Sequence, residues 1–246
     1  MLVHARKMSR YFALFVMGAL VMQGQTARAD VTLWYNGDTD GRDALANQTG
    51  SADGMIYENF VVPTGQTFRI TGLFSNNAMF NPGAASTAHY EIRSGVSAGN
   101  GGTLLASGDR ADSVTATGRT FNFGGLAVSE FKNLVSIPAI TLSAGTYWLA
   151  VAPDVSNQNS FITTTSGANA VGSPPGNDGN SFFSSTFFGD SFVATSDPSL
   201  EGPGTWDYSM GVIGTAQVPE PSSLILGLLG FVASGSVFRA RRRRQS

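Results

Sequence analysis

Between residues 30 and 216, apolar and polar side chains alternate in short runs separated by turn residues. Residues 66–74 show this pattern clearly, with Phe68 and Ile70 on one face and polar side chains between them. Because successive side chains of a strand point to opposite faces, such alternation predicts β-strands, and a helical period is not sustained anywhere in the region. We expect strands at residues 31–35, 55–62, 66–74, 88–93, 103–107, 113–123, 131–142, 146–152, 161–165, 181–188, 192–195 and 205–213.

This number of short, turn-separated strands is typical of an all-β domain built as a sandwich or barrel. We predict a single antiparallel β-sandwich over residues 30–216. Glycines and prolines concentrate in residues 166–180, which form the longest predicted loop. Loops of this length often carry function.

The first 29 residues have the pattern of a secretory signal peptide. Basic residues within the first ten positions precede an apolar run at residues 11–22. Ala27 and Ala29 then fit the small-x-small rule for cleavage. An uncleaved N-terminal anchor is the alternative, but about a dozen apolar residues are too few to span a bilayer comfortably. We therefore expect cleavage after Ala29.

The other end of the chain departs from the β pattern as well. Residues 222–238 carry no charge, and residues 239–246 are rich in arginine. An uncharged stretch of this length is at the short end of the range for a transmembrane helix, and the arginines should remain cytoplasmic. Pro219, Glu220 and Pro221 precede it and should be extended, since proline does not fit inside a regular helix. On physical grounds alone, a retained membrane anchor is favoured over a cleaved signal.

The order of these three elements, from the Pro-Glu-Pro motif through the apolar segment to the basic end, resembles the PEP-CTERM sorting signal. The resemblance covers residues 217–246. It implies a Gram-negative bacterium and a sorting protease of the exosortase type. Pro219, Glu220 and Pro221 would be its recognition motif, and an inner-membrane intermediate would precede release to the cell surface or extracellular matrix.

A second resemblance covers much of the β region. Its motifs lie at residues 34–48, 57–71 and 141–149, and their order is similar to that of the jelly-roll-like β-sandwich modules often found ahead of PEP-CTERM tails. The resemblance implies an exported surface module without a defined activity.

Charge and composition narrow the possible chemistry. Four of the 15 basic residues precede residue 30 and five follow residue 238, which leaves six against 17 acidic residues and a net charge of −11 for residues 30–220. So acidic a region is poorly suited to nucleic acid, whose binding depends on cationic contacts to phosphate. The chain has no cysteine, and His89 is the one histidine of the exported part. Thiol catalysis and histidine-cluster metal sites are excluded.

One acidic loop has the spacing of a calcium ligand set. Asn36, Asp38, Asp40 and Asp43 follow the first predicted strand, with oxygen ligands at alternate positions before a glycine. The twelfth position of the loop is Asn47 in place of the bidentate glutamate of an EF-hand. The same residues also favour a metal-free turn, because Asn and Asp side chains hydrogen-bond to the nearby backbone and Gly adopts positive φ without strain. Ca²⁺ is the one candidate cofactor.

Four carboxylates on or near predicted strands are candidates for glycoside hydrolysis, namely Glu58, Glu91, Glu130 and Asp207. That reaction requires two carboxylates at a defined separation, and solvent-facing strand residues are the simpler interpretation. Aromatic pairs that could stack on sugars form a second set: Trp34 with Tyr35, Tyr147 with Trp148, and Trp206 with Tyr208. Alternation sends one member of each pair inward, so no carbohydrate-binding residue can be assigned.

We expect a non-enzymatic structural or adhesive protein of the cell surface, in contact with exopolysaccharide. The alternative is a lectin-like carbohydrate-binding module, and a glycan-active hydrolase is a third possibility. The expected partners are an exosortase-type protease, exopolysaccharide and, through residues 222–238, the membrane before processing.

Overall fold

The computed structural model describes residues 29–155, 160–174, 178–200 and 206–218. Residues 1–28 of the predicted signal peptide, with Ala27, the motif at residues 219–221 and the predicted transmembrane helix lie outside these ranges, and Ala29 is the first described residue. Inside them the chain is all β, apart from one short 3₁₀ turn at Pro82–Ala84. These ranges contain no helix that is long and apolar enough to cross a membrane.

Eleven strands are present in the described ranges. They are β1 (Val31–Tyr35), β2 (Thr39–Ala46), β3 (Met55–Met79), β4 (Thr87–Ser94), β5 (Thr103–Phe123), β6 (Leu126–Pro153), β7 (Ser160–Thr165), β8 (Phe182–Ser185), β9 (Asp190–Ala194), β10 (Asp207–Tyr208) and β11 (Met210–Gln217).

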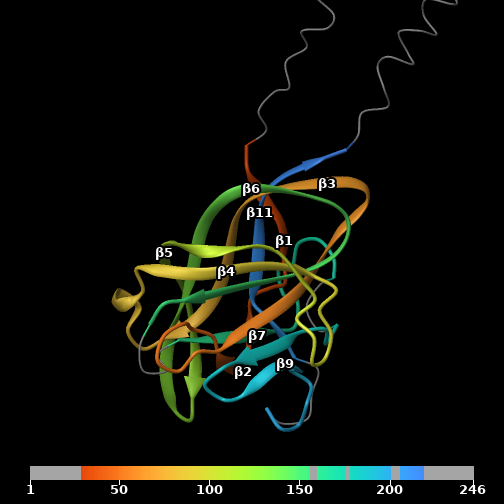
Figure 1. Cartoon of the computed structure of the whole chain (residues 1–246). Helices are drawn as coiled ribbons and strands as arrows, with labels where there is room; N and C mark the ends of the chain where they lie inside the picture. The colour runs from red at the N-terminus through yellow and green to blue at the C-terminus, as the bar shows by residue number, and fades with distance from the viewer. Residues whose placement is uncertain (1–28, 156–159, 175–177, 201–205, 219–246) are drawn as a thin grey trace, which may run out of the picture.

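All strand pairings are antiparallel, and the strands form one continuous curled sheet (Figure 1). The main path runs β1-β11-β3-β6-β4-β5. β7 pairs with β2, β10 and the end of β3, while β8 pairs with the start of β3 and with β9. The prediction of an antiparallel all-β domain is confirmed. The predicted sandwich would consist of two separate sheets, whereas the strands here are hydrogen-bonded into a single sheet. The sandwich and its jelly-roll connectivity are therefore not confirmed and remain predictions.

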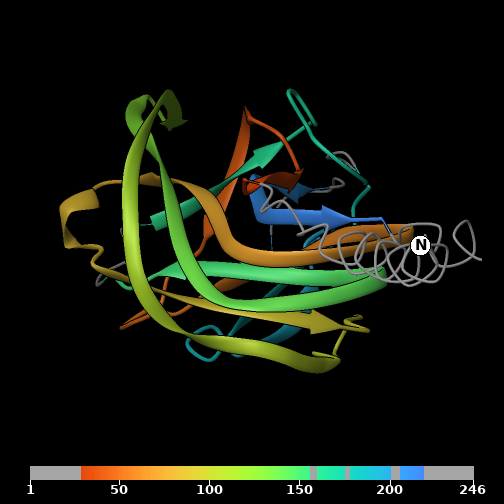
Figure 2. The ribbon, with the colours of Figure 1, turned by 90° about the horizontal axis from the view of Figure 1, so that it is seen from above.

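β3, β5 and β6 are much longer than the sequence predicted, and Figure 2 shows them bending strongly as they cross the molecule. The prediction of two separate strands at residues 55–62 and 66–74, divided at Pro63 and Gly65, was wrong. β3 continues through Pro63, and the pairing with β6 passes from Val62 opposite Gly145 to Thr67 opposite Ser143. The extra residues on β3 form an irregular bulge, which bends a strand without ending it.

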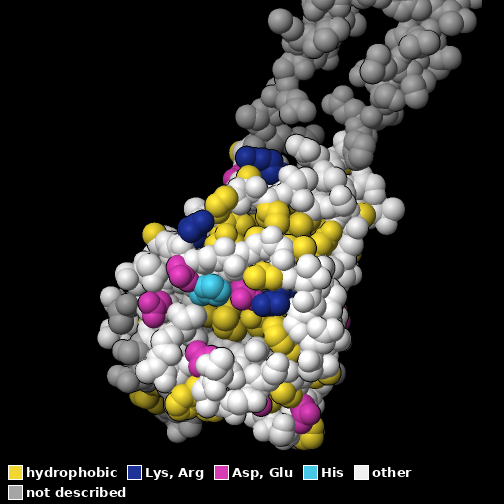
Figure 3. Space-filling model, in the orientation of Figure 1, with side chains coloured by type: hydrophobic (Ala, Val, Ile, Leu, Met, Phe, Trp, Pro, Cys, Tyr) yellow, Lys and Arg dark blue, Asp and Glu magenta, His cyan; other side chains and the backbone are white. Residues whose placement is uncertain are grey.

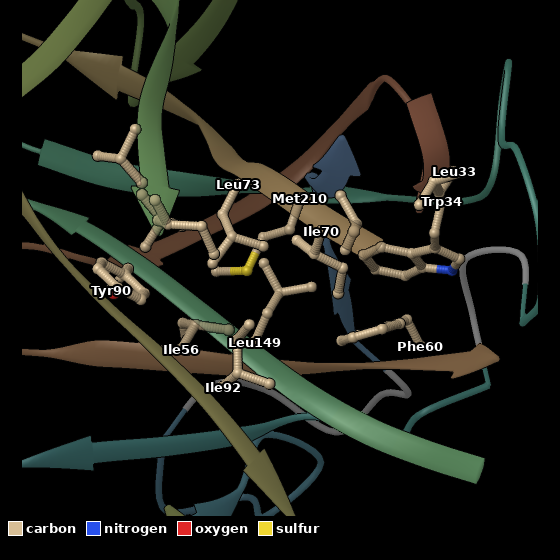
Figure 4. Close-up of a cluster of buried hydrophobic side chains, with 14 of the residues drawn as sticks. Leu33, Trp34, Ile56, Phe60, Ile70, Leu73, Tyr90, Ile92, Leu149 and Met210 are labelled. Carbon is tan, nitrogen blue, oxygen red and sulfur yellow. The ribbon is translucent and has the colours of Figure 1, made fainter. Parts of the chain in front are cut away.

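The curled sheet encloses one main apolar core, made of side chains from strands at both ends of the sequence (Figure 4). Ile56, Ile92 and Leu149 point toward Leu73 and Met210, and all five are fully buried. Alternation explains the selection, because residues two apart on each strand face the same side of the sheet. A smaller apolar cluster on the other face of β3 lies under β8 and β9 and includes Tyr57, Trp148 and Phe182.

The two ends of the described domain meet. Val31 at the start of β1 lies opposite Gly214 near the end of β11. In Figure 1 the first strand begins and the last strand ends at the same end of the molecule, while β2, β7 and β9 lie toward the other end. The last described residue, Val218, therefore lies at the same end of the domain as its N-terminal strand.

Candidate functional site

The acidic loop predicted to bind calcium begins between β1 and β2. The Asp38 carboxylate accepts hydrogen bonds from the Tyr35 hydroxyl at 2.6 Å, from Arg119 at 2.8 Å and from the Asn169 amide at 2.8 Å. Burial alone would raise the pKa of Asp38, but these hydrogen bonds and the charge of Arg119 hold it below its ordinary value. Both carboxylate oxygens are therefore already engaged by protein donors.

Arg119 links this loop to a second carboxylate inside the domain. Its Nε donates to Glu130 at 2.6 Å while Nη1 donates to Asp38. Glu130 is fully buried, and its other oxygen accepts a hydrogen bond from the Thr163 hydroxyl at 2.8 Å. The guanidinium thus neutralises two carboxylates, one from the loop after β1 and one from β6, an arrangement that suits a structural role.

The other members of the predicted calcium set have separate partners. Asp40 forms an ion pair with Arg42 at 2.6 Å, and Asp43 accepts a hydrogen bond from the backbone of Ala44. Asn36 is buried and donates to the Tyr208 carbonyl. The structure does not bring Asn36, Asp38, Asp40 and Asp43 around one point. Their calcium binding remains a prediction, with these protein contacts competing against it.

A different group of carboxylates does converge. Glu58 on β3, Asp207 on β10 and Asp178 in the segment before β8 each place an oxygen within 4.8 Å of the others. Glu58 and Asp207 are fully buried, whereas Asp178 is exposed. We call Glu58, Asp178 and Asp207 the carboxylate cluster. Sequence analysis named Glu58 and Asp207 separately and missed Asp178, whose only signal was its place in the long loop at residues 166–180.

Backbone amides hold Glu58 and Asp207 in place. Glu58 accepts from the amide of Tyr208 at 2.7 Å and from that of Asn59 at 3.2 Å. Asp207 accepts from the amides of Asp178 at 2.6 Å and Gly179 at 3.0 Å. The segment before β8 is therefore attached to β10 through one side chain.

The pKa of Glu58 lies well above its ordinary value. Burial is the main cause, and the negative charges of Asp207 and Asp178 add to it. The hydrogen bonds from Tyr208 and Asn59 favour the charged form without reversing the shift. A buried carboxylate beside two others is strongly stabilised by binding either a proton or a cation.

The remaining hydrolase candidate, Glu91 on β4, lies in a surface group with His89, Arg93 and Tyr57. Glu91 accepts hydrogen bonds from Arg93 and from the Tyr57 hydroxyl. Burial alone would raise its pKa, but its hydrogen bonds to His89, Arg93 and Tyr57 lower it to about 2. Glu91 is therefore an anion at any ordinary pH, which removes it as a general acid. Figure 3 shows acidic and basic side chains beside the histidine on this face.

The predicted sugar-stacking aromatics are largely internal. Trp34, Trp148 and Tyr208 are buried, and Trp34 points into the core in Figure 4. Trp206 is only partly buried, but the Arg42 guanidinium lies 4.9 Å from its ring centroid. The largely exposed aromatic rings of the described ranges are phenylalanines: Phe80, Phe187 and Phe188.

Asp112 on β5 makes the domain sensitive to pH. Burial raises the pKa of its carboxyl to about 7, although a hydrogen bond from the Leu134 backbone opposes the rise. Because the pKa of Asp112 is higher in the folded than in the unfolded state, its contribution to the free energy of unfolding is fully present below about pH 4. This contribution is lost as pH rises through about 7. His89, whose pKa is raised by Glu91 and Asp109, acts in the same direction. The lowered pKa of Glu91 has the opposite effect on the pH dependence, because the stability that Glu91 contributes to the domain is lost as pH falls through about 2.

We therefore expect higher stability near pH 5 than at pH 8. The Asp112→Asn variant should be more stable than the wild type at pH 8 by about 1–2 kcal/mol, because both carboxylate oxygens are shielded from solvent and the charged form is disfavoured there. At pH 5 the two should differ little. Urea unfolding in chelator at both pH values measures this, with Asp190→Asn as a surface control. Equal stability of wild type and Asp112→Asn at pH 8 would contradict the expectation.

The sequence that follows β11 decides how the protein is handled by the cell. Residues 217–244 match the family described as the PEP-CTERM protein-sorting motif. The motif begins at Gln217, the last residue of β11, so the domain runs directly into its sorting signal. The PEP-CTERM resemblance is thereby confirmed. The chain is an exported protein, sorted by an exosortase through the membrane to the cell surface. No curated protein and no solved structure matches the chain.

Proposed function

We propose that this protein is a non-enzymatic structural or adhesive component of the surface of a Gram-negative bacterium, retained in its extracellular matrix by contact with exopolysaccharide. The observation that carries the proposal is the PEP-CTERM motif, which starts where the last strand ends. The sorting signal leaves from the same end as the N-terminus, so the whole β domain projects from one attachment point.

The placement of the candidate catalytic carboxylates supports a role without catalysis. Glu58, Glu130 and Asp207 are fully buried, and Glu130 is neutralised by Arg119. A glycosidase needs an acid and a second carboxylate that both reach the scissile bond. Side chains without solvent exposure do not meet that condition.

A lectin-like domain is the alternative. Carbohydrate recognition commonly uses Trp and Tyr rings, which combine an apolar face with a polar edge. Here Trp34, Trp148 and Tyr208 are buried, and the exposed rings are phenylalanines without a polar edge. Weak contact with a polysaccharide over a broad polar surface fits this distribution better than a defined sugar pocket.

The sorting motif gives the first test. Changing Pro219, Glu220 and Pro221 together to alanine should block processing, because these residues form the recognition motif of the family. Mass spectrometry of protein from the producing cells should find the wild-type chain ending near these positions and the variant retaining its arginines. Val218→Ala is the matched control and should be processed normally. A wild-type chain with intact arginines would overturn the proposal of exosortase release.

The polysaccharide contact is tested by fractionating the same cells. In a strain unable to make exopolysaccharide, the processed wild-type protein should move from the matrix fraction to the culture medium. Undiminished retention on cells without exopolysaccharide would refute the contact while leaving the sorting result intact. Release of reducing sugars by the purified protein would favour the hydrolase instead.

A further inference from the structure

The carboxylate cluster concentrates negative charge where water cannot screen it. Its three carboxylates lie within 4.8 Å of one another, and two of them are fully buried. Like charges this close and this deep repel strongly unless a proton or a cation intervenes. Within the described ranges, no arginine or lysine forms an ion pair with Glu58 or Asp178. The hydrogen bonds to Glu58 come from backbone amides, which bring dipoles but no net charge.

A neighbouring asparagine supplies the second observation. Asn59 is 4% exposed, and its Oδ1 has no hydrogen-bond partner in the described part of the chain. Its Nδ2 donates to Asp178 at 2.9 Å, which places the amide group directly against the cluster. A buried carbonyl oxygen without a partner is costly and calls for an explanation. Rotating the amide by half a turn exchanges the two atoms and directs Oδ1 toward the carboxylates.

We propose that Glu58, Asn59, Asp178 and Asp207 bind one divalent cation, and that this cation is Ca²⁺. A cation at this point neutralises the carboxylates and, with the amide rotated, binds Asn59 Oδ1 in place of the hydrogen bond that Nδ2 now donates to Asp178. The donor set contains only carboxylate and amide oxygens, which suits a hard cation and disfavours zinc or copper. Exposure of Asp178 leaves room for water to complete the coordination.

Calcium fits better than magnesium for two reasons. Ca²⁺ accepts irregular arrangements of six to eight oxygens, whereas Mg²⁺ demands a near-octahedral shell and retains most of its water. The protein is exported, and extracellular modules work with dissociation constants of about 0.1–1 mM for Ca²⁺. A site of modest affinity would therefore be filled outside the cell.

The ion would join parts of the chain that are distant in sequence. Glu58 and Asn59 belong to β3, Asp178 to the segment before β8, and Asp207 to β10. A cation that binds only when these segments have assembled stabilises the folded state by mass action. This site differs from the acidic loop at residues 36–43, where Asp38 and Asp40 form ion pairs with arginines.

The test compares thermal unfolding of the full-length chain, purified in mild detergent, in about 1 mM Ca²⁺ and in chelator. We expect a rise in Tm of about 1–5 °C with Ca²⁺, and a smaller rise with the same concentration of Mg²⁺. Tb³⁺ provides a direct binding assay, since its luminescence is sensitised by a nearby tryptophan. The Trp148 indole donates to the carbonyl of Asn180, two residues from Asp178.

Three variants assign the response to residues. Asp178→Asn and Glu58→Gln should abolish both the Tm rise and the saturable Tb³⁺ signal. Asp43→Asn is the matched control from the acidic loop and should respond to Ca²⁺ like the wild type.

Two outcomes would overturn the proposal. One is a wild-type protein with identical unfolding in Ca²⁺ and in chelator and without saturable Tb³⁺ binding. The other is loss of the Ca²⁺ response in Asp43→Asn together with its retention in Asp178→Asn, which would move the site to the acidic loop. Asp178 is exposed and its backbone amide is unchanged by the substitution, so the variant is expected to fold.

Discussion

Replacing Arg119 with methionine is expected to lower the free energy of unfolding by about 3–5 kcal/mol. The substitution leaves Glu130 without the guanidinium that donates to it at 2.6 Å, and Glu130 is fully buried. A buried carboxylate that loses its cationic partner must either take up a proton or remain buried as an unpaired anion, and both lower the stability of the folded state. Asp38 loses its ion pair in the same step.

Urea unfolding of the full-length chain measures this effect, with Arg69→Met as a control on an exposed arginine that should change stability by less than about 0.5 kcal/mol. The double variant Arg119→Met, Glu130→Leu should recover much of the loss, because it removes the orphaned charge as well. If the single and double variants are equally unstable, the loss comes from packing and the electrostatic account fails.

The second large effect is expected from Trp34. Its side chain is fully buried, its ring centroid lies 6.0 Å from that of Phe60, and its Nε1 donates to the Pro174 carbonyl at 3.0 Å. Changing Trp34 to alanine should cost about 3–5 kcal/mol, since the core loses a large ring and β1 loses one of its hydrogen bonds to the loop before β8. Trp34→Phe should fall between alanine and the wild type.

Denaturant curves again provide the measurement, and Val31→Ala is the control within the same strand. Val31 is 56% exposed and should tolerate alanine almost without change. A Trp34→Ala protein with wild-type stability but reduced adhesion to exopolysaccharide would reverse the assignment, because it would identify Trp34 as a binding residue.

The sequence allowed the strand content of the fold to be predicted well, because alternation records which face of a strand is buried. Strand lengths were underestimated where polar or turn-forming residues lie inside a strand. Pro63 and Gly65 were interpreted as a turn, yet β3 continues past them, since a bulge absorbs the extra residues. The pairing of β1 with β11 joins the two ends of the domain, and the local sequence pattern of either strand does not predict such a contact.

The candidate site was harder to predict, for a related reason. Spacing along the chain suggested that Asp38 and Asp40 share a cation. In the structure Asp40 forms an ion pair with Arg42, and Asp38 forms one with Arg119. The carboxylates that do meet come from residues 58, 178 and 207, and only tertiary pairing of β3 and β10 with a loop brings them together. The spacing of residues along the chain can predict ligands that are close in sequence. The carboxylate cluster combines residues that are far apart in sequence, so it depends on how the strands pair.

The position of β11 has a consequence for the order of events during export. β1 emerges first, yet in the described part of the chain its only strand partner is β11, which is made last. β11 also pairs with β3 along its whole length, so the sheet lacks a strand between β1 and β3 until Gln217 has crossed the membrane. The polypeptide therefore stays incompletely folded throughout translocation, and the domain closes only when the sorting signal itself reaches the membrane.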